Sequence, residues 1–184
     1  MSIEAWINGL VDGDRLFPLK PVFDGDPIRR PMFMSREVRD LVEGPWGSAA
    51  AARRCNQLRA DLEAFVVGAE LSICIRPHEA HDAQMGLLSP VRDGVWDVRS
   101  QHPRPGIRVL GQFAQRDWFL AMVPASRSRK LDYILRGPLD DGGSQAWSDA
   151  ISDTRRMWQS LCPIFVPIVG DDARDYFSDR YNPI

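Results

Sequence analysis

The feature that most constrains the fold is a group of three strand-like segments in the second half of the chain. Residues 95–100 favour a first strand, and residues 106–113 alternate between two faces along a second. Residues 118–123 are apolar on both faces, which is typical of a strand at the centre of a sheet. The link at 114–117 is short enough for a hairpin. The pattern therefore predicts three consecutive antiparallel strands, a meander.

Helix-forming sequence lies on both sides of this meander. Ser35 is a typical N-cap before a short apolar pattern at helical spacing, which Gly44 ends. Ser48 opens a longer helix through about residue 67, and Ser144 opens another through about Leu161. The elements predict an α+β fold, with two N-terminal helices packed on a small antiparallel sheet (the three-strand meander) followed by a C-terminal helix. Further candidates for short strands are residues 32–34, 69–75 and 164–169.

Composition divides the 184 residues into three parts, and the length fits a single domain with extensions. Residues 1–31 contain four prolines but enough apolar side chains to predict an N-terminal extension packed on the core. Residues 32–170 are predicted to form the single α+β domain. Residues 171–184, with four aspartates and two arginines, are predicted to be an acidic C-terminal tail.

Several classes of protein are excluded by composition. No segment approaches the roughly 18 apolar residues that a membrane-spanning helix needs. The first residues lack the cationic and apolar regions of a secretory signal. Three cysteines at wide spacing, without a CxxC motif, predict a reducing, cytoplasmic setting. The familiar motifs of small-molecule enzymes are also missing, so neither a cofactor nor a membrane partner is predicted.

Charge is distributed unevenly along the chain. The net charge is −2, yet the stretch from Arg92 to Arg136 holds nine cations and four aspartates, which gives +5 there and −7 elsewhere. The cations are 21 arginines and only two lysines. Arginine is the better residue for bidentate phosphate contacts, although a GC-rich genome produces the same excess.

The basic stretch contains the strongest candidate site. Because the third strand of a meander ends beside the start of the second, cations that follow the third strand are expected to meet those on the second. Several guanidinium groups gathered with a lysine form a phosphate site, and a solvated basic rim is the alternative. The candidate binding residues are Arg99, Arg104, Arg108, Arg127, Arg129 and Lys130.

Two motifs in this stretch point to one family. Residues 95–99 read Val-Trp-Asp-Val-Arg, and residues 106–110 read Gly-Ile-Arg-Val-Leu. An apolar strand at 118–123 and a basic loop at 127–133 follow. This order resembles the RelE/HigB/ParE-type toxin superfamily over roughly residues 32–136. The chain differs from that pattern in its long extensions at both ends, an insertion between the helices and the meander, and its acidic balance.

The resemblance implies a toxin-like, RNA-binding protein of a bacterial toxin–antitoxin system or mobile element, whose partners are ribosome-bound RNA and an antitoxin. In the mRNA-cleaving members, a metal-independent endoribonuclease site places catalytic residues at positions that match Arg108, Arg127 and Tyr133. The two arginines would stabilise the charge that develops when an RNA 2′-OH attacks the adjacent phosphate. Because arginine stays protonated, proton transfer falls to Tyr133, Lys130 or His102. The basic residues Arg99, Arg104, Arg129 and Lys130 would bind RNA.

A second hypothesis of another class stays open. The same scaffold would serve as a non-catalytic protein–protein interaction or regulatory module, as in a mobile-element, defence-related or gyrase-poison-like protein. The long extensions, the acidic balance and the absence of a clear acid–base pair favour this alternative. The sequence does not fix the oligomeric state.

Two other groups of residues have simpler interpretations. A metal-like cluster lacks a second ligand pair at zinc spacing, so a polar loop without a metal is predicted there; its members are Cys74, His78, Glu79, His81 and Asp82. Four aromatic residues could stack on RNA bases, but their strand spacing favours core positions; they are Trp96, Phe113, Trp118 and Phe119.

Overall fold

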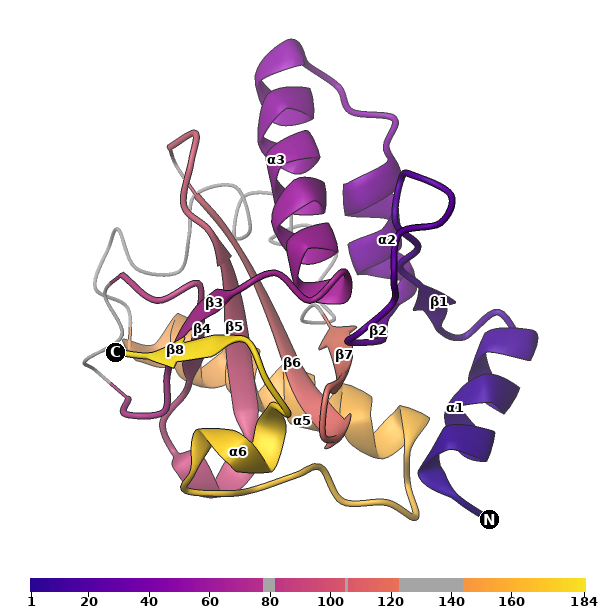
Figure 1. Cartoon of the computed structure of the whole chain (residues 1–184), viewed down its shortest axis with the longest axis vertical. Coiled ribbons are helices and arrows are strands. Elements are labelled where there is room, and N and C mark those ends of the chain that lie inside the picture. Colours follow the sequence, from indigo (N-terminus) through magenta and orange to yellow (C-terminus); the bar gives the residue numbers. More distant parts are fainter. Residues whose placement is uncertain (78–81, 105, 123–143) are drawn as a thin grey trace.

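The computed structural model describes residues 1–77, 82–104, 106–122 and 144–184, with the backbone alone at 144–147. Within these residues the chain forms five α-helices and an eight-stranded mixed sheet (Figure 1). The helices are α1 (Ile3–Asp12), α2 (Arg36–Glu43), α3 (Ala49–Val66), α5 (Ser144–Leu161) and α6 (Ala173–Tyr176). The strands are β1 (Phe17–Pro18), β2 (Met32–Met34), β3 (Leu71–Cys74), β4 (Met85–Leu87), β5 (Val95–Ser100), β6 (Ile107–Gln115), β7 (Trp118–Met122) and β8 (Tyr181–Pro183).

The sheet order is β1-β2-β7-β6-β5-β4-β3-β8. Strands β5, β6 and β7 pair antiparallel in sequence order. The predicted fold, a small antiparallel sheet with two N-terminal helices and one C-terminal helix, is nevertheless wrong. The meander is only the centre of a larger mixed sheet, and the described residues form two further helices, α1 and α6. Strand β2 pairs parallel with β7, and β3 pairs parallel with both β4 and β8.

Strands β2 and β3 lie within the predicted candidates 32–34 and 69–75, whereas β1, β4 and β8 were not predicted because they are short. Strands β1, β2, β3, β4 and β8 contain two to four residues each. So few residues show no readable alternation, and their ladder partners lie far away in the sequence. Residues 164–169, a strand candidate, form no strand.

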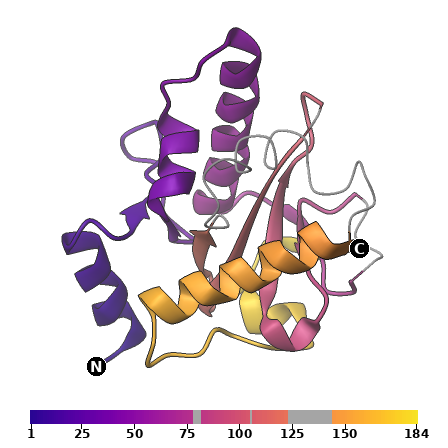
Figure 2. The same ribbon diagram turned by 180° about the vertical axis from the view of Figure 1, so that it is seen from behind.

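The helices cover both faces of the sheet (Figures 1 and 2). On one face, side chains of α2, α3 and α6 share the main core with alternate residues of the central strands. On the other face, α5 lies across the sheet in Figure 2. Its Trp158 and Leu161 pack with α1 and β7, and its Ala150 and Ile151 pack on β5 and β6. None of the helices in the described ranges is long and apolar enough to cross a bilayer.

Both ends of the chain contribute to the core. Ile7 and Leu16 are fully buried, and so are Tyr176 and Phe177 of the acidic C-terminal segment. The ring of Tyr176 packs edge-on against Trp96 of β5, with 4.8 Å between ring centroids. Residues 171–184 therefore supply β8 and part of the aromatic core.

Arg30, a buried residue of the N-terminal segment, forms hydrogen bonds with the C-terminal segment. Arg30 is 1% exposed, and its guanidinium donates hydrogen bonds to the carbonyl oxygens of Ala69 at 2.9 Å, Asp179 at 2.7 Å and Arg180 at 3.0 Å. It also lies 5.7 Å from the ring centroid of Phe177. Burial lowers the pKa of Arg30, although the nearby aspartates oppose the shift. Nothing in the sequence distinguished this arginine from its neighbours.

The three cysteines are free thiols in the core. Burial raises the pKa of Cys162 to about 11 and also raises the pKa of Cys55. Because the thiolate is the reactive form, a raised pKa lowers the reactive fraction at neutral pH. Cys55 and Cys162 are therefore inert packing groups in the folded state.

We expect a thiol reagent such as iodoacetamide to leave the native protein unmodified at about pH 8, where thiols of ordinary pKa react. Intact-mass measurement should then show three adducts after unfolding in guanidinium chloride, one for each of the three cysteines. Labelling of Cys162 in the native protein as fast as in the denatured one would contradict its burial.

Candidate functional site

Two of the predicted basic residues meet on the central hairpin. Arg99 of β5 and Arg108 of β6 are direct cross-strand partners, so their side chains leave the same face of the sheet. Asp97 stands two residues before Arg99 and shares that face, because side chains alternate along a strand. This is the face that α5 covers further along the same strands.

The two arginines share one carboxylate oxygen. Arg99 Nε and Arg108 Nη1 each donate to Asp97 Oδ2 at 2.8 Å. The Asp97 side chain is fully buried, while those of Arg99 and Arg108 are 8% and 27% exposed. A buried carboxylate needs such partners, because an unpaired charge in the interior is very costly. The ion pairs fix both guanidinium groups against the sheet.

Asp97 is the carboxylate that both arginines contact. The second oxygen of Asp97, Oδ1, has no hydrogen-bond partner within the described part of the chain. Much of the charge of each arginine is directed at Asp97, so the cluster is less strongly positive than two free arginines would be.

A glycine on the neighbouring strand makes room for this cluster. Gly86 of β4 is the register partner of Asp97. A Cβ atom at Gly86 would lie 2.6 Å from Arg99 Nη2 and 3.0 Å from Asp97 Oδ1. Glycine inside a strand often marks such a close approach, and this is the signal by which Gly86 could have been found in the sequence. Neither residue was predicted as part of the site: Gly86 belongs to no sequence motif, and Asp97 is only the central residue of the Val-Trp-Asp-Val-Arg motif.

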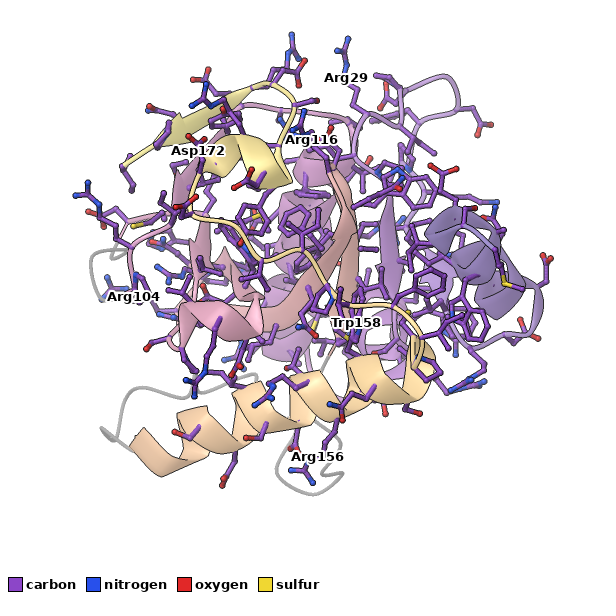
Figure 3. All side chains as sticks on the ribbon, turned by 90° about the horizontal axis from the view of Figure 1, so that it is seen from below. Arg29, Arg104, Arg116, Arg156, Trp158 and Asp172 are labelled. Atoms are coloured by element: carbon purple, nitrogen blue, oxygen red, sulfur yellow. The ribbon has the colours of Figure 1, made fainter. Side chains whose placement is uncertain are left out.

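The connection between β5 and β6 carries two further candidates. His102 and Arg104 are both exposed there, beyond the last ladder pair of the two strands. Figure 1 shows this hairpin extending past the neighbouring strands, and Figure 3 places Arg104 at the edge of the molecule. We call Arg99, His102, Arg104 and Arg108 the hairpin surface.

The remaining predicted site residues lie outside the described residues. They are Arg127, Arg129, Lys130 and Tyr133. The predicted convergence of these residues on Arg108 therefore stays a prediction.

The other two groups from the sequence analysis do not add to the hairpin surface. Trp96, Phe113 and Phe119 are fully buried in the core, and Trp118 packs on Phe33 with 5.3 Å between ring centroids. Cys74 is buried, and three members of the metal-like cluster lie outside the described residues. Within the ranges that the structure describes, no three potential ligands gather to hold a metal.

Comparisons with family models, with curated proteins and with solved structures found no match to this chain. The geometry of the hairpin surface and the sequence motifs at residues 95–110 are the features that bear on function.

Proposed function

We propose that this protein is a toxin-like RNA-binding protein that holds RNA phosphates on the hairpin surface. The observation that carries the proposal is the in-register pairing of Arg99 with Arg108 beside Asp97. It holds two guanidinium groups in fixed positions on one face of a protein whose net charge is −2. Phosphate contacts by such groups dominate affinity for nucleic acids.

The position of Arg104 supports the same proposal. It is exposed in the loop that leads into β6, and Arg108 follows at the start of that strand. A single RNA strand lying along the hairpin would meet both side chains. His102 in the same loop offers a ring for stacking or a hydrogen bond to a base edge.

For Arg108, the ion pair favours binding over catalysis. Its Nη1 already donates to Asp97, so part of its charge would not be available to a transition state. Of the proton-transfer groups named from the sequence, His102 lies in the described part of the chain, exposed on the hairpin. RNA cleavage is therefore an alternative outcome of the RNA-binding experiment.

The second candidate function, a non-catalytic protein-interaction module, is favoured by one other observation. Apolar side chains in the segment after α5 are strongly exposed, Ile164 at 66% and Val166 at 86%. Exposed apolar side chains in one segment are typical of interaction surfaces. This candidate predicts that the wild-type protein neither binds nor cleaves RNA.

We expect wild-type protein to bind a fluorescein-labelled single-stranded RNA in an anisotropy titration. Combining Arg104→Ala with Arg108→Ala should weaken binding by about tenfold or more and reduce the salt slope by roughly 0.7 for each lost phosphate contact on single-stranded RNA. The matched control is Arg156→Ala, which removes an arginine of α5 that is 71% exposed and points away from the sheet (Figure 3).

The same proteins distinguish RNA binding from RNA cleavage and from a protein that does not bind RNA. Arg108→Lys keeps a cation and should retain most of the affinity if the contact is to phosphate. Absence of RNA binding by the wild-type protein, or an equal loss in the Arg156→Ala control, would overturn the proposal. Cleavage of the RNA on a denaturing gel that disappears in Arg108→Ala would assign Arg108 the catalytic role instead.

A further inference from the structure

A groove of about 540 Å³ lies where the segment from β1 to Val22 runs past helices α2 and α3. The charged residues that line it come from three elements of the fold. They are Lys20 after β1, Arg39 and Glu43 of α2, and Arg59 of α3. Strands β2 and β7 lie between β1 and β6 in the sheet, so this groove is distinct from the hairpin surface.

Two of the cations in the groove are not matched by a carboxylate. Arg39 is paired, because its Nη2 lies 2.7 Å from Asp40 Oδ1 and its Nε lies 3.8 Å from Glu43 Oε2. Arg59 Nη2 donates instead to the backbone carbonyl oxygen of Lys20, at 3.4 Å. Within the described ranges, neither Lys20 nor Arg59 forms an ion pair with an acidic side chain. An anionic group is therefore the complementary partner for this part of the groove.

A tight turn borders the groove. The backbone nitrogen of Asp26 donates to the carbonyl oxygen of Phe23 at 3.3 Å, and Gly25 has a φ of +99°, which glycine adopts readily. The turn is attached to α3, because the backbone nitrogen of Val22 donates to Glu63 Oε1 at 2.8 Å. Figures 1 and 2 show this loop beside α2. The turn therefore has a defined shape and a fixed position next to the groove.

The turn exposes large apolar side chains. Phe23 is 72% exposed, Val22 59% and Ile28 54%. Several such side chains in one short segment are typical of an interaction site, and apolar residues surrounded by charged ones are typical of protein–protein interfaces. Asp24 and Asp26 are exposed in the same turn, and their charge disfavours an anionic lipid surface. The chemistry of the turn therefore fits a protein partner.

The edge of the sheet limits how such a partner can bind. Strand β1 is the outermost strand, and the backbone nitrogen of Leu19 donates inward to the carbonyl oxygen of Met32 at 2.9 Å. Because hydrogen bonds alternate along an antiparallel ladder, the backbone of Pro18 faces outward. Proline has no N–H, so an added strand would find no donor there. Contact through side chains is therefore favoured over extension of the sheet.

We propose that this groove and the adjoining turn form a docking surface for an acidic segment of a partner protein. An aspartate or glutamate of the partner contacts Lys20 and Arg59, and a neighbouring apolar side chain packs against Phe23. Charge complementarity identifies the occupant, because the unmatched groups in the groove are cations. The proposal does not depend on RNA binding by the hairpin surface.

Selection of phage-displayed random peptides on the full chain tests the proposal with a defined probe. We expect the enriched peptides to carry an aspartate or glutamate beside an aromatic or large aliphatic residue. In an anisotropy titration, a selected peptide should bind about tenfold more weakly to Arg59→Glu and to Phe23→Ser than to the wild type. The matched control, Arg53→Glu, makes the same charge change at an exposed position of α3 outside the groove and should bind as the wild type does.

An exchange of charges keeps the test independent of folding. A peptide whose acidic residue is replaced by lysine should lose binding to the wild type but regain it with the double variant Lys20→Glu, Arg59→Glu. Failure to enrich acidic peptides, or equal binding of the selected peptide to the wild type and the double variant, would overturn the proposal. Co-sedimentation of the wild type with phosphatidylserine vesicles that Phe23→Ser abolishes would do the same, because it would assign the turn to a lipid surface.

Discussion

Replacing Asp97 by alanine is expected to lower the free energy of unfolding by about 3–5 kcal/mol, the usual cost of removing one partner from a buried ion pair. The substitution leaves Arg99 and Arg108 facing each other across the ladder without the carboxylate that both contact at 2.8 Å. Arg99 is 8% exposed, so water replaces little of what it loses. Urea denaturation followed by circular dichroism measures the change.

A matched control and a rescue make this prediction specific. Asp40→Ala removes a carboxylate that also accepts two hydrogen bonds from an arginine, but Asp40 is 58% exposed. The loss there should stay below about 1 kcal/mol, as for other surface ion pairs. Adding Arg99→Met to Asp97→Ala should recover part of the stability, because it removes the mostly buried cation that has lost the Asp97 carboxylate. A loss below about 1 kcal/mol for Asp97→Ala itself would mean that water stabilises the cluster.

Replacing Arg30 by methionine is expected to lower the free energy of unfolding by about 3 kcal/mol or more, since hydrogen bonds to charged groups contribute about 1.5–3 kcal/mol each. Methionine keeps the length and apolar contacts of the side chain but leaves the carbonyl oxygens of Ala69, Asp179 and Arg180 without their donor. The measurement is again a urea titration.

Digestion of the C-terminus gives a second measurement, because Arg30 forms hydrogen bonds with residues near that end of the chain. Two of its three acceptors lie just before β8, so loss of Arg30 should release the C-terminal strand first. We expect carboxypeptidase to shorten Arg30→Met faster than the wild type under native conditions. Arg29→Met, which changes the exposed arginine beside it, should behave as the wild type in both experiments. Equal effects of Arg30→Met and Arg29→Met would show that the buried hydrogen bonds of Arg30 contribute little to stability.

The local elements were readable because each is encoded by neighbouring residues. Ser35 and Ser48 accept hydrogen bonds from the backbone nitrogens of Val38 and Ala51, as expected of N-caps. Strands β5, β6 and β7 are long enough for alternation to reveal their faces. Alternation also placed Arg108 on the face opposite the core residues of β6. The sequence therefore predicted part of the hairpin surface.

The sequence by itself determined the meander, the helices that flank it and the basic residues that its hairpin carries, because all of these depend on contacts between near neighbours. Only the tertiary structure decided that the sheet has eight strands, that Asp97 binds both arginines, and that Arg30 joins the two ends of the chain. Parallel pairing of short strands and the hydrogen bonds of Arg30 depend on distances between residues far apart in sequence. Asp97 lies near its two arginines in the chain, but its burial depends on such distances too. Such distances are set when the whole core packs, and no local pattern records them.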